Sequence, residues 1–179
     1  ESEDSSGVGV GVAVAVNVSR VDNQALVAET AAISSHGLSV TADMAAGDGE
    51  TTPTHTLSAD ATSGAGVGGS VGVAGAVAVN IVHVSTDARI ASGDLRAASG
   101  ETINTNGGSL ELKGESSTDE SATAQPAVTG GGSGSDVGVG ASVAVSYAVN
   151  ATKAQIEAVN VSGSVDDFTV DAVAHHQVT

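Results

Sequence analysis

The chain has no cysteine and no tryptophan, and its 179 residues include only two prolines and two aromatic residues, Tyr147 and Phe168. Without cysteine it can form neither a disulfide nor a thiolate metal site. Two aromatic rings are too few to line a typical carbohydrate-cleaving pocket. No apolar run reaches the roughly 20 residues that a membrane-spanning helix needs, so we expect no membrane span.

Basic residues are also scarce. Five lysines and arginines stand against 21 acidic residues, which gives a net charge of −16. An acidic surface repels phosphate backbones, so we expect no nucleic-acid partner. The same charge discourages edge-to-edge association of β-strands. The first residues, ESEDSSG, do not fit a signal peptide, and we expect any export signal to lie outside these 179 residues.

Valine alternating with small residues is what the chain has in abundance. The stretch GVGVGVAVAVN over residues 7–17 returns as GVAGAVAVN over 72–80 and as GVGASVAVS over 138–146. Valine at every second position predicts a β-strand with a valine face and a nearly flat face of glycine, alanine and serine. The flat side allows another backbone to approach closely, so we predict that Ala15→Phe or Ala78→Phe abolishes folding.

These strands mark an internal repeat. Asn17, Asn80 and Ser146 correspond; the second lies 63 residues after the first, and the third 66 after the second. Eight residues later the repeat has Ala25, Ala88 and Ala154, and then Val27, Ile90 and Ile156. A period near 64 residues indicates a repeat architecture. We predict a partial unit over 1–63, a complete unit over 64–129 and a partial unit over 130–179, together one continuous domain cut from a longer array.

A second strand is predicted in each unit, at GLSVTA (37–42), SLELKG (109–114) and FTVDAVA (168–174). Between it and the next valine strand lie polar stretches over 43–63 and 115–135, which we predict to be variable loops or polar strands. The segment GETINTNGG over 100–108 has the composition of an insertion.

Many short β-branched strands at a fixed period, with weak helix signals, predict an all-β fold. We favour a β-solenoid resembling a parallel β-helix, with several turns of chain per unit. Its corners would fall at Asn80 or at Ser85–Asp87, because the apolar run from Val71 to Ile90 has few other turn residues. The alternative is an elongated antiparallel sandwich or meander. Disorder is a third interpretation, against which the repeated alternation speaks.

The predicted core is the set of apolar residues that recur at matched positions. It comprises Val12, Val14, Val16, Val27, Val77, Val79, Ile90, Val143, Val145 and Ile156.

Reactive groups show no catalytic or metal-binding spacing. His175 and His176 are adjacent, so on a strand they would point to opposite faces. The candidate metal ligands are Asp166, Asp167 and Asp171, but no calcium-loop motif accompanies them. The acidic residues also do not recur between units, which favours solvated surface charge. We expect no enzyme activity and no cofactor, with Ca²⁺ as the one ion to consider.

The pattern GVGASVAVS, followed by AQI and by a later strand such as GLSVTA, resembles the repeats of very large bacterial surface and secreted proteins. These are adhesins and autotransporter passengers of the filamentous-haemagglutinin type. The resemblance covers nearly the whole chain and implies an extracellular or cell-surface β-solenoid stalk or fibre. It implies no catalytic residue, since the repeat motif contains none.

The leading interpretation is therefore a structural repeat module, an elongated acidic β scaffold for surface attachment or self-association. Its partners would be neighbouring repeats, a second copy, a surface glycan or a host protein. The alternative is a module that binds Ca²⁺ or glycans through the polar stretches over 43–63 and 115–135.

Overall fold

The computed structural model describes residues 7–28, 31–46, 53–65, 71–90, 102–128, 137–157 and 159–179. They form ten strands and no helix, so the chain is all-β as predicted. The strands are β1 (Val8–Val27), β2 (Ala32–Ser34), β3 (Leu38–Asp43), β4 (Thr54–Ala65), β5 (Val71–Ile90), β6 (Thr102–Asn104), β7 (Leu110–Val128), β8 (Val137–Ile156), β9 (Asn160–Ser162) and β10 (Phe168–Val178).

The first sheet stacks the three valine strands in the order β1-β5-β8. All neighbours are parallel, and Asn17 lies opposite Asn80, which lies opposite Ser146. Ala25, Ala88 and Ala154 align in the same way, as do Val27, Ile90 and Ile156. The alignment predicted from the sequence is therefore the register of the sheet, because like residues of successive units stack on one another.

The second sheet runs back along the first and is built around β7. One edge of β7 pairs with β10, and the other edge pairs with β3 and then with β4, all parallel. Leu38, Leu110 and Phe168 align, which confirms the second set of predicted strands. Most of the predicted polar stretches is strand as well, since β4 and β7 cover 54–65 and 110–128. Their small inward residues let a polar sequence form a packed strand.

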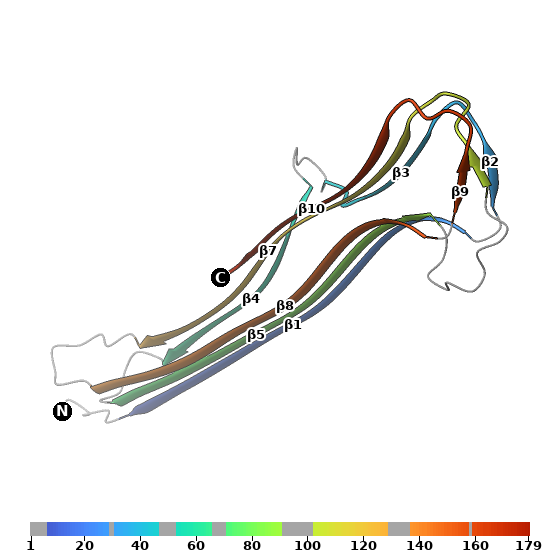
Figure 1. Cartoon of the computed structure of the whole chain (residues 1–179). Helices are drawn as coiled ribbons and strands as arrows, with labels where there is room; N and C mark the ends of the chain where they lie inside the picture. Colours follow the sequence, from blue (N-terminus) through green and yellow to red (C-terminus); the bar gives the residue numbers. More distant parts are fainter. Residues whose placement is uncertain are drawn as a thin grey trace, which may run out of the picture.

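A short third sheet, β2-β6-β9, joins the two long sheets at one end (Figure 1). The segment predicted as an insertion over 100–108 contains β6, so that prediction is wrong for 102–104. The chain then turns at Asn106 and Gly107, both with positive φ, and the Gly108 amide donates to the Thr105 carbonyl at 2.8 Å. Asn-Gly is the preferred pair where both central turn residues are left-handed.

Each third of the chain thus supplies strands to all three sheets, and every pairing among the described strands is parallel. The expectation of several turns of chain per unit is wrong, because each unit passes once through each sheet. No corner occurs at Asn80 or at Ser85–Asp87, since β5 is continuous over 20 residues. The antiparallel alternative also fails among these strands.

The predicted unit boundary after residue 63 falls inside β4, two residues before that strand ends. The predicted boundary after residue 129 lies just past the end of β7, outside the described residues.

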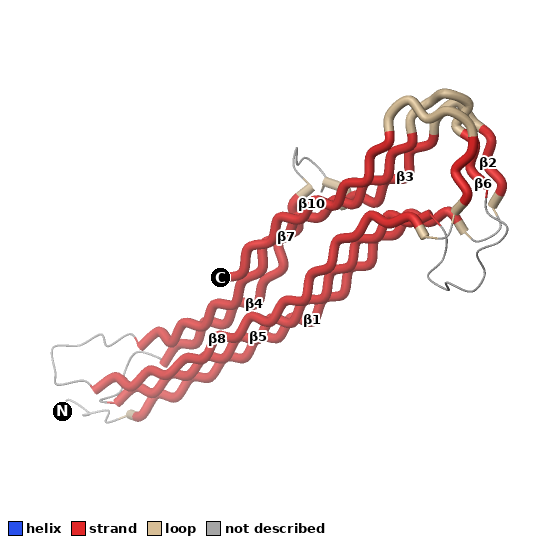
Figure 2. Tube along the Cα trace, viewed as in Figure 1, coloured by secondary structure: helices blue, strands red, loops and turns tan. Residues whose placement is uncertain are grey.

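The two long sheets face each other along their length, as Figure 2 shows. Near the corner sheet the space between them holds large side chains, including Ile90, Leu110 and Leu112. The middle holds Met44, Val82 and Val84, and the apolar side chains of the far end are alanines, among them Ala59, Ala61, Ala76 and Ala78. The side chains between the sheets therefore become smaller from the corner sheet toward the far end.

Most of the predicted core lies on the outside. Over residues 8–18, 71–81 and 137–147, the inward positions of β1, β5 and β8 are glycine, alanine, serine and asparagine, and the alternating valines point outward. Ile90 is fully buried, and Val27 and Ile156 pack beside it. The other seven are corrected to outward-facing residues, and Val12 at 74% exposed marks the extreme. They are Val12, Val14, Val16, Val77, Val79, Val143 and Val145.

Candidate functional surface

The outer side of the first sheet is a flat apolar surface. We define the valine face as every second residue of 8–18 on β1, 71–81 on β5 and 137–147 on β8. In-register stacking arranges these residues in six rows of three, from Val8, Val71 and Val137 to Val18, Ile81 and Tyr147. None of the 18 side chains is charged; all are valine except Gly75, Ile81, Ala141 and Tyr147.

Valine faces outward because the inner side has room only for small residues. Ala76 and Ala78 are 1% and 0% exposed, and they pack against Ala59 and Ala61 of β4. A one-residue shift would bring valine inside and force the sheets apart. Exposed apolar patches of this extent mark interaction surfaces in soluble proteins.

The outer side of the second sheet has the opposite character. Its outward positions are mostly serine, threonine and acidic residues, and they include six carboxylates. These are Asp43, Asp60, Glu111, Glu115, Asp119 and Asp171. Lys113 stands among them, and its hydrogen bond to Glu115, followed by the charge of that carboxylate, raises the pKa of Lys113. We call this surface the acidic face. The protein is thus a two-layered slab with one apolar and one acidic side.

The valine face ends where charged residues begin. Arg20 Nε donates to Asp22 Oδ2 at 2.7 Å on β1, and Arg89 pairs with Asp87 on β5. In both pairs, the hydrogen bond to the carboxylate is the main cause that raises the pKa of the arginine. A shallow hollow of about 130 Å³ lies among Gln24, Leu26, Asp87 and Arg89. This polar end bounds the valine face along the strands.

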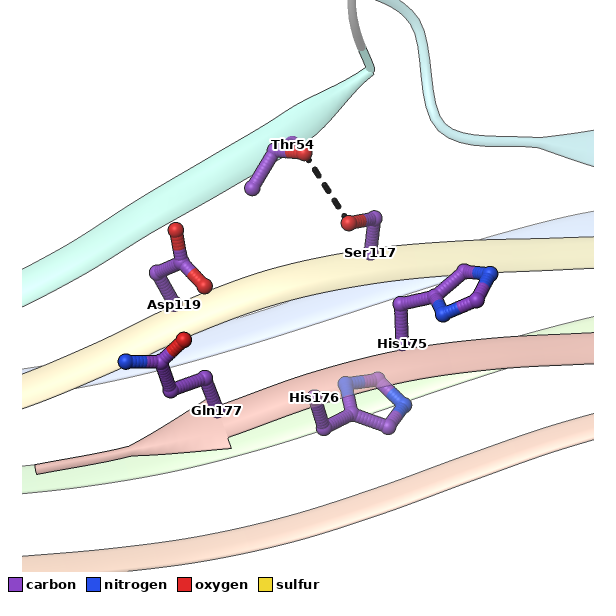
Figure 3. A pocket seen from close by; sticks show the side chains of 6 residues that line it. All are labelled: Thr54, Ser117, Asp119, His175, His176 and Gln177. Carbon is purple, nitrogen blue, oxygen red and sulfur yellow. Dashed lines mark hydrogen bonds between the residues drawn. The ribbon is translucent and has the colours of Figure 1, made fainter.

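A depression of about 260 Å³ lies on the acidic face, where β4, β7 and β10 meet. Thr54, Ser117 and His175 form one row across the three strands, and Thr54 Oγ1 is 2.9 Å from Ser117 Oγ. Asp119 and Gln177 form the next row (Figure 3). No hydrogen bond joins His175 to Ser117 or Asp119 among these residues, so they do not form a relay for a nucleophilic serine.

Beneath this depression lies a buried polar cluster. His176 Nδ1 is 2.6 Å from Thr118 Oγ1, which donates to Glu120 Oε1 at 2.5 Å. Because the threonine proton goes to Glu120, Nδ1 of His176 must carry the hydrogen that it shares with Thr118. Asn150 also donates to Glu120 Oε1, at 3.0 Å, and Glu120 Oε2 has no hydrogen-bond partner within the described part of the chain. The cluster joins β7, β8 and β10 between the sheets, and its His176 also lines the depression.

The three candidate metal ligands do not come together as a site. Asp166 and Asp167 precede β10, where their backbones bond to Gly108 and Leu110. Asp171 lies on β10 opposite Lys113, a cation that competes with any metal for its carboxylate. Among the described residues no three histidine or acidic side chains group as metal ligands.

No protein-family model, no curated protein and no solved structure matches this chain. Among the described residues no helix is long and apolar enough to cross a membrane. Function is therefore inferred from the two faces and from the way they are built.

Sequence reasoning found the valines but placed them on the wrong side of the sheet. The small residues between them were the available signal, because a buried alanine row requires an equally small partner. Such a partner is present in the sequence as the alternating pairs Ala59 and Ala61, and Ala122 and Ala124. The Thr54, Ser117 and His175 row has no comparable signal, because its members come from three units and do not recur.

Proposed function

We propose that this chain is a structural repeat module of an extracellular bacterial adhesin or fibre, in which each unit of about 64 residues forms one flattened coil of a β-solenoid. The observation that supports this most is the residue-by-residue register of the three units. Asn17 Nδ2 donates to Asn80 Oδ1 at 2.8 Å, so even a buried polar group is matched by its counterpart in the next unit.

The edges of the stack are suited to further coils. Within the described residues β1 and β8 each pair on one side only, and each presents 20 residues of strand. Proteins usually shorten or interrupt such edges to prevent association. Edges this long and regular instead favour continued stacking, by further units or by another copy.

The geometry of the slab favours area over reach. A 20-residue strand is about 66 Å long, whereas each added strand widens the sheet by about 4.8 Å. A unit therefore extends the stack by less than 0.1 Å per residue, roughly twentyfold less than a helix would. It adds about 320 Å² to each outer side, by the same strand dimensions. The module is better suited to building a broad surface than a long stalk.

Small-angle scattering tests the architecture. At a protein concentration low enough to give single chains, we expect a flattened particle with a radius of gyration of about 22 Å, from the length of the strands. A compact domain of this size would give about 16 Å. The smaller value, or a far-UV spectrum without β-structure, would remove the proposal.

The alternative is a module that binds glycans or Ca²⁺, and the depression on the acidic face supports its glycan form. Thr54 lies in the polar stretch 43–63 and Ser117 in the polar stretch 115–135. In the structure both line the depression together with Asp119 and His175. Hydroxyl, carboxylate and imidazole groups suit a sugar, whereas Ca²⁺ needs six to eight oxygen ligands. Thermal melts with and without about 2 mM CaCl₂ test Ca²⁺ binding, since a bound ligand raises Tm.

A binding screen with acidic and neutral oligosaccharides tests glycan binding. Binding that Asp119→Ala abolishes would favour the alternative over a purely structural role.

A further inference from the structure

We propose that the valine face is the docking surface for a second copy of this chain, which lies face to face on it with its strands running in the opposite direction. The proposal rests on the structural role proposed above, because it names the partner of the surface that the stacked units build. It concerns the outer side of the first sheet and not the strand edges.

The first argument is area. Six rows of side chains on three strands cover about 40 Å by about 14 Å, or roughly 560 Å². A contact between two such faces would bury about 1,100 Å² in total, which exceeds the roughly 1,000 Å² expected of a specific interface. Val12 and Val14 are 74% and 66% exposed, so this surface is available in the single chain. Every additional unit would add about 190 Å² per copy.

The second argument is the distribution of charge. The chain carries a net charge of −16, yet the valine face has no charged side chain and the acidic face has six carboxylates. Two valine faces in contact leave both acidic faces in water. A valine face on the partner's acidic face would bury carboxylates such as Asp119 without partners, which is costly. A membrane surface is a poorer match, because interfacial elements usually carry basic residues around their apolar side.

The third argument is orientation. A two-fold axis across the strands places β5 over the partner's β5 in reverse, with Gly75 opposite the partner's Val77. The gap left by the glycine then accommodates a valine side chain of the other copy. It also overlays the six uncharged rows on each other. A parallel arrangement would instead overlay the polar ends of the two copies and take the Arg89–Asp87 ion pair out of contact with water, which is costly.

Sedimentation velocity over a range of protein concentrations tests the proposal with a matched pair of variants. Val77→Glu adds a charge to the middle strand of the valine face, away from both strand edges. Ser121→Glu adds the same charge to β7, the middle strand of the other sheet, on its acidic face. Both positions are partly buried. We expect wild-type and Ser121→Glu to form dimers, and Val77→Glu to dimerise roughly 100-fold more weakly or not at all.

Val14→Glu, at a mostly exposed position, gives the same test if Val77→Glu fails to fold. Monomeric wild-type protein at about 1 mM, or equal weakening by Val77→Glu and Ser121→Glu, would overturn the proposal. Co-sedimentation of monomers with neutral phosphatidylcholine vesicles would also overturn it, in favour of a lipid surface. Scattering from the single chain keeps the two claims separate, because a flattened monomer that never dimerises removes the docking surface and leaves the structural module intact.

Discussion

At the scale of single residues, a glycine on an inner face allows the backbones of the two sheets to approach closely. Gly114 on β7 illustrates this, because a Cβ there would lie 2.5 Å from the carbonyl oxygen of Lys153 on β8. The facing backbone occupies the space where a side chain would stand. Gly75, on the valine face, has no atom closer than 4.0 Å to such a Cβ.

These two glycines give a matched pair. We expect Gly114→Ala to lower the free energy of unfolding by about 2 kcal/mol, because the methyl group must push two sheets apart. We expect Gly75→Ala to be neutral or to stabilise by up to about 1 kcal/mol, because it restricts the unfolded chain without a clash. Urea denaturation of both variants measures the difference. Equal effects would mean that the sheets are not in close contact at Gly114.

At the scale of the element, the sequence shows that each long strand has a valine face and a small-residue face, but it does not show which of the two is buried. The general preference for burying larger apolar residues predicts that valine is inside. The opposing sheet decides otherwise, because the alanines of β4 and β7 leave no room for valine. The register between units was predictable because like residues stack on like residues. The number of times that each unit passes through a sheet was not predictable. The other units have a single glycine of positive φ after their short strand, Gly37 and Gly163, and neither is preceded by asparagine.

Adjacent residues of β5 test the assignment of faces. We expect Ala78→Phe to cost about 3 kcal/mol or more, or to prevent folding, because Ala78 is fully buried against alanines. Val77→Phe should change the stability of the single chain by less than about 1 kcal/mol, since it enlarges a side chain that faces solvent. Thermal melts at low protein concentration compare them. The reverse order of stability would restore the original prediction of a valine core.

At the scale of the whole molecule, the slab exposes more surface than a compact protein of its mass. Its accessible surface is 10112 Å², against about 7,800 Å² expected for a monomer of this size. An exposed apolar sheet remains soluble only if something covers it or if charge elsewhere on the molecule secures solubility. The acidic face supplies the charge, and the valine face supplies the surface to be covered.

Salt should therefore strengthen association of this chain. The net charge of −16 opposes contact between copies, and its range falls from about 30 Å at 10 mM salt to about 3 Å at 1 M. Contact between valine faces involves no ion pairs, so screening removes the repulsion and leaves the attraction. We expect sedimentation equilibrium to give a dimer roughly tenfold tighter at the higher salt concentration, while Val77→Glu stays monomeric at both. A dimer that dissociates as salt is added would instead be held by ion pairs such as those of Arg20 or Arg89, and the valine face would not be its interface.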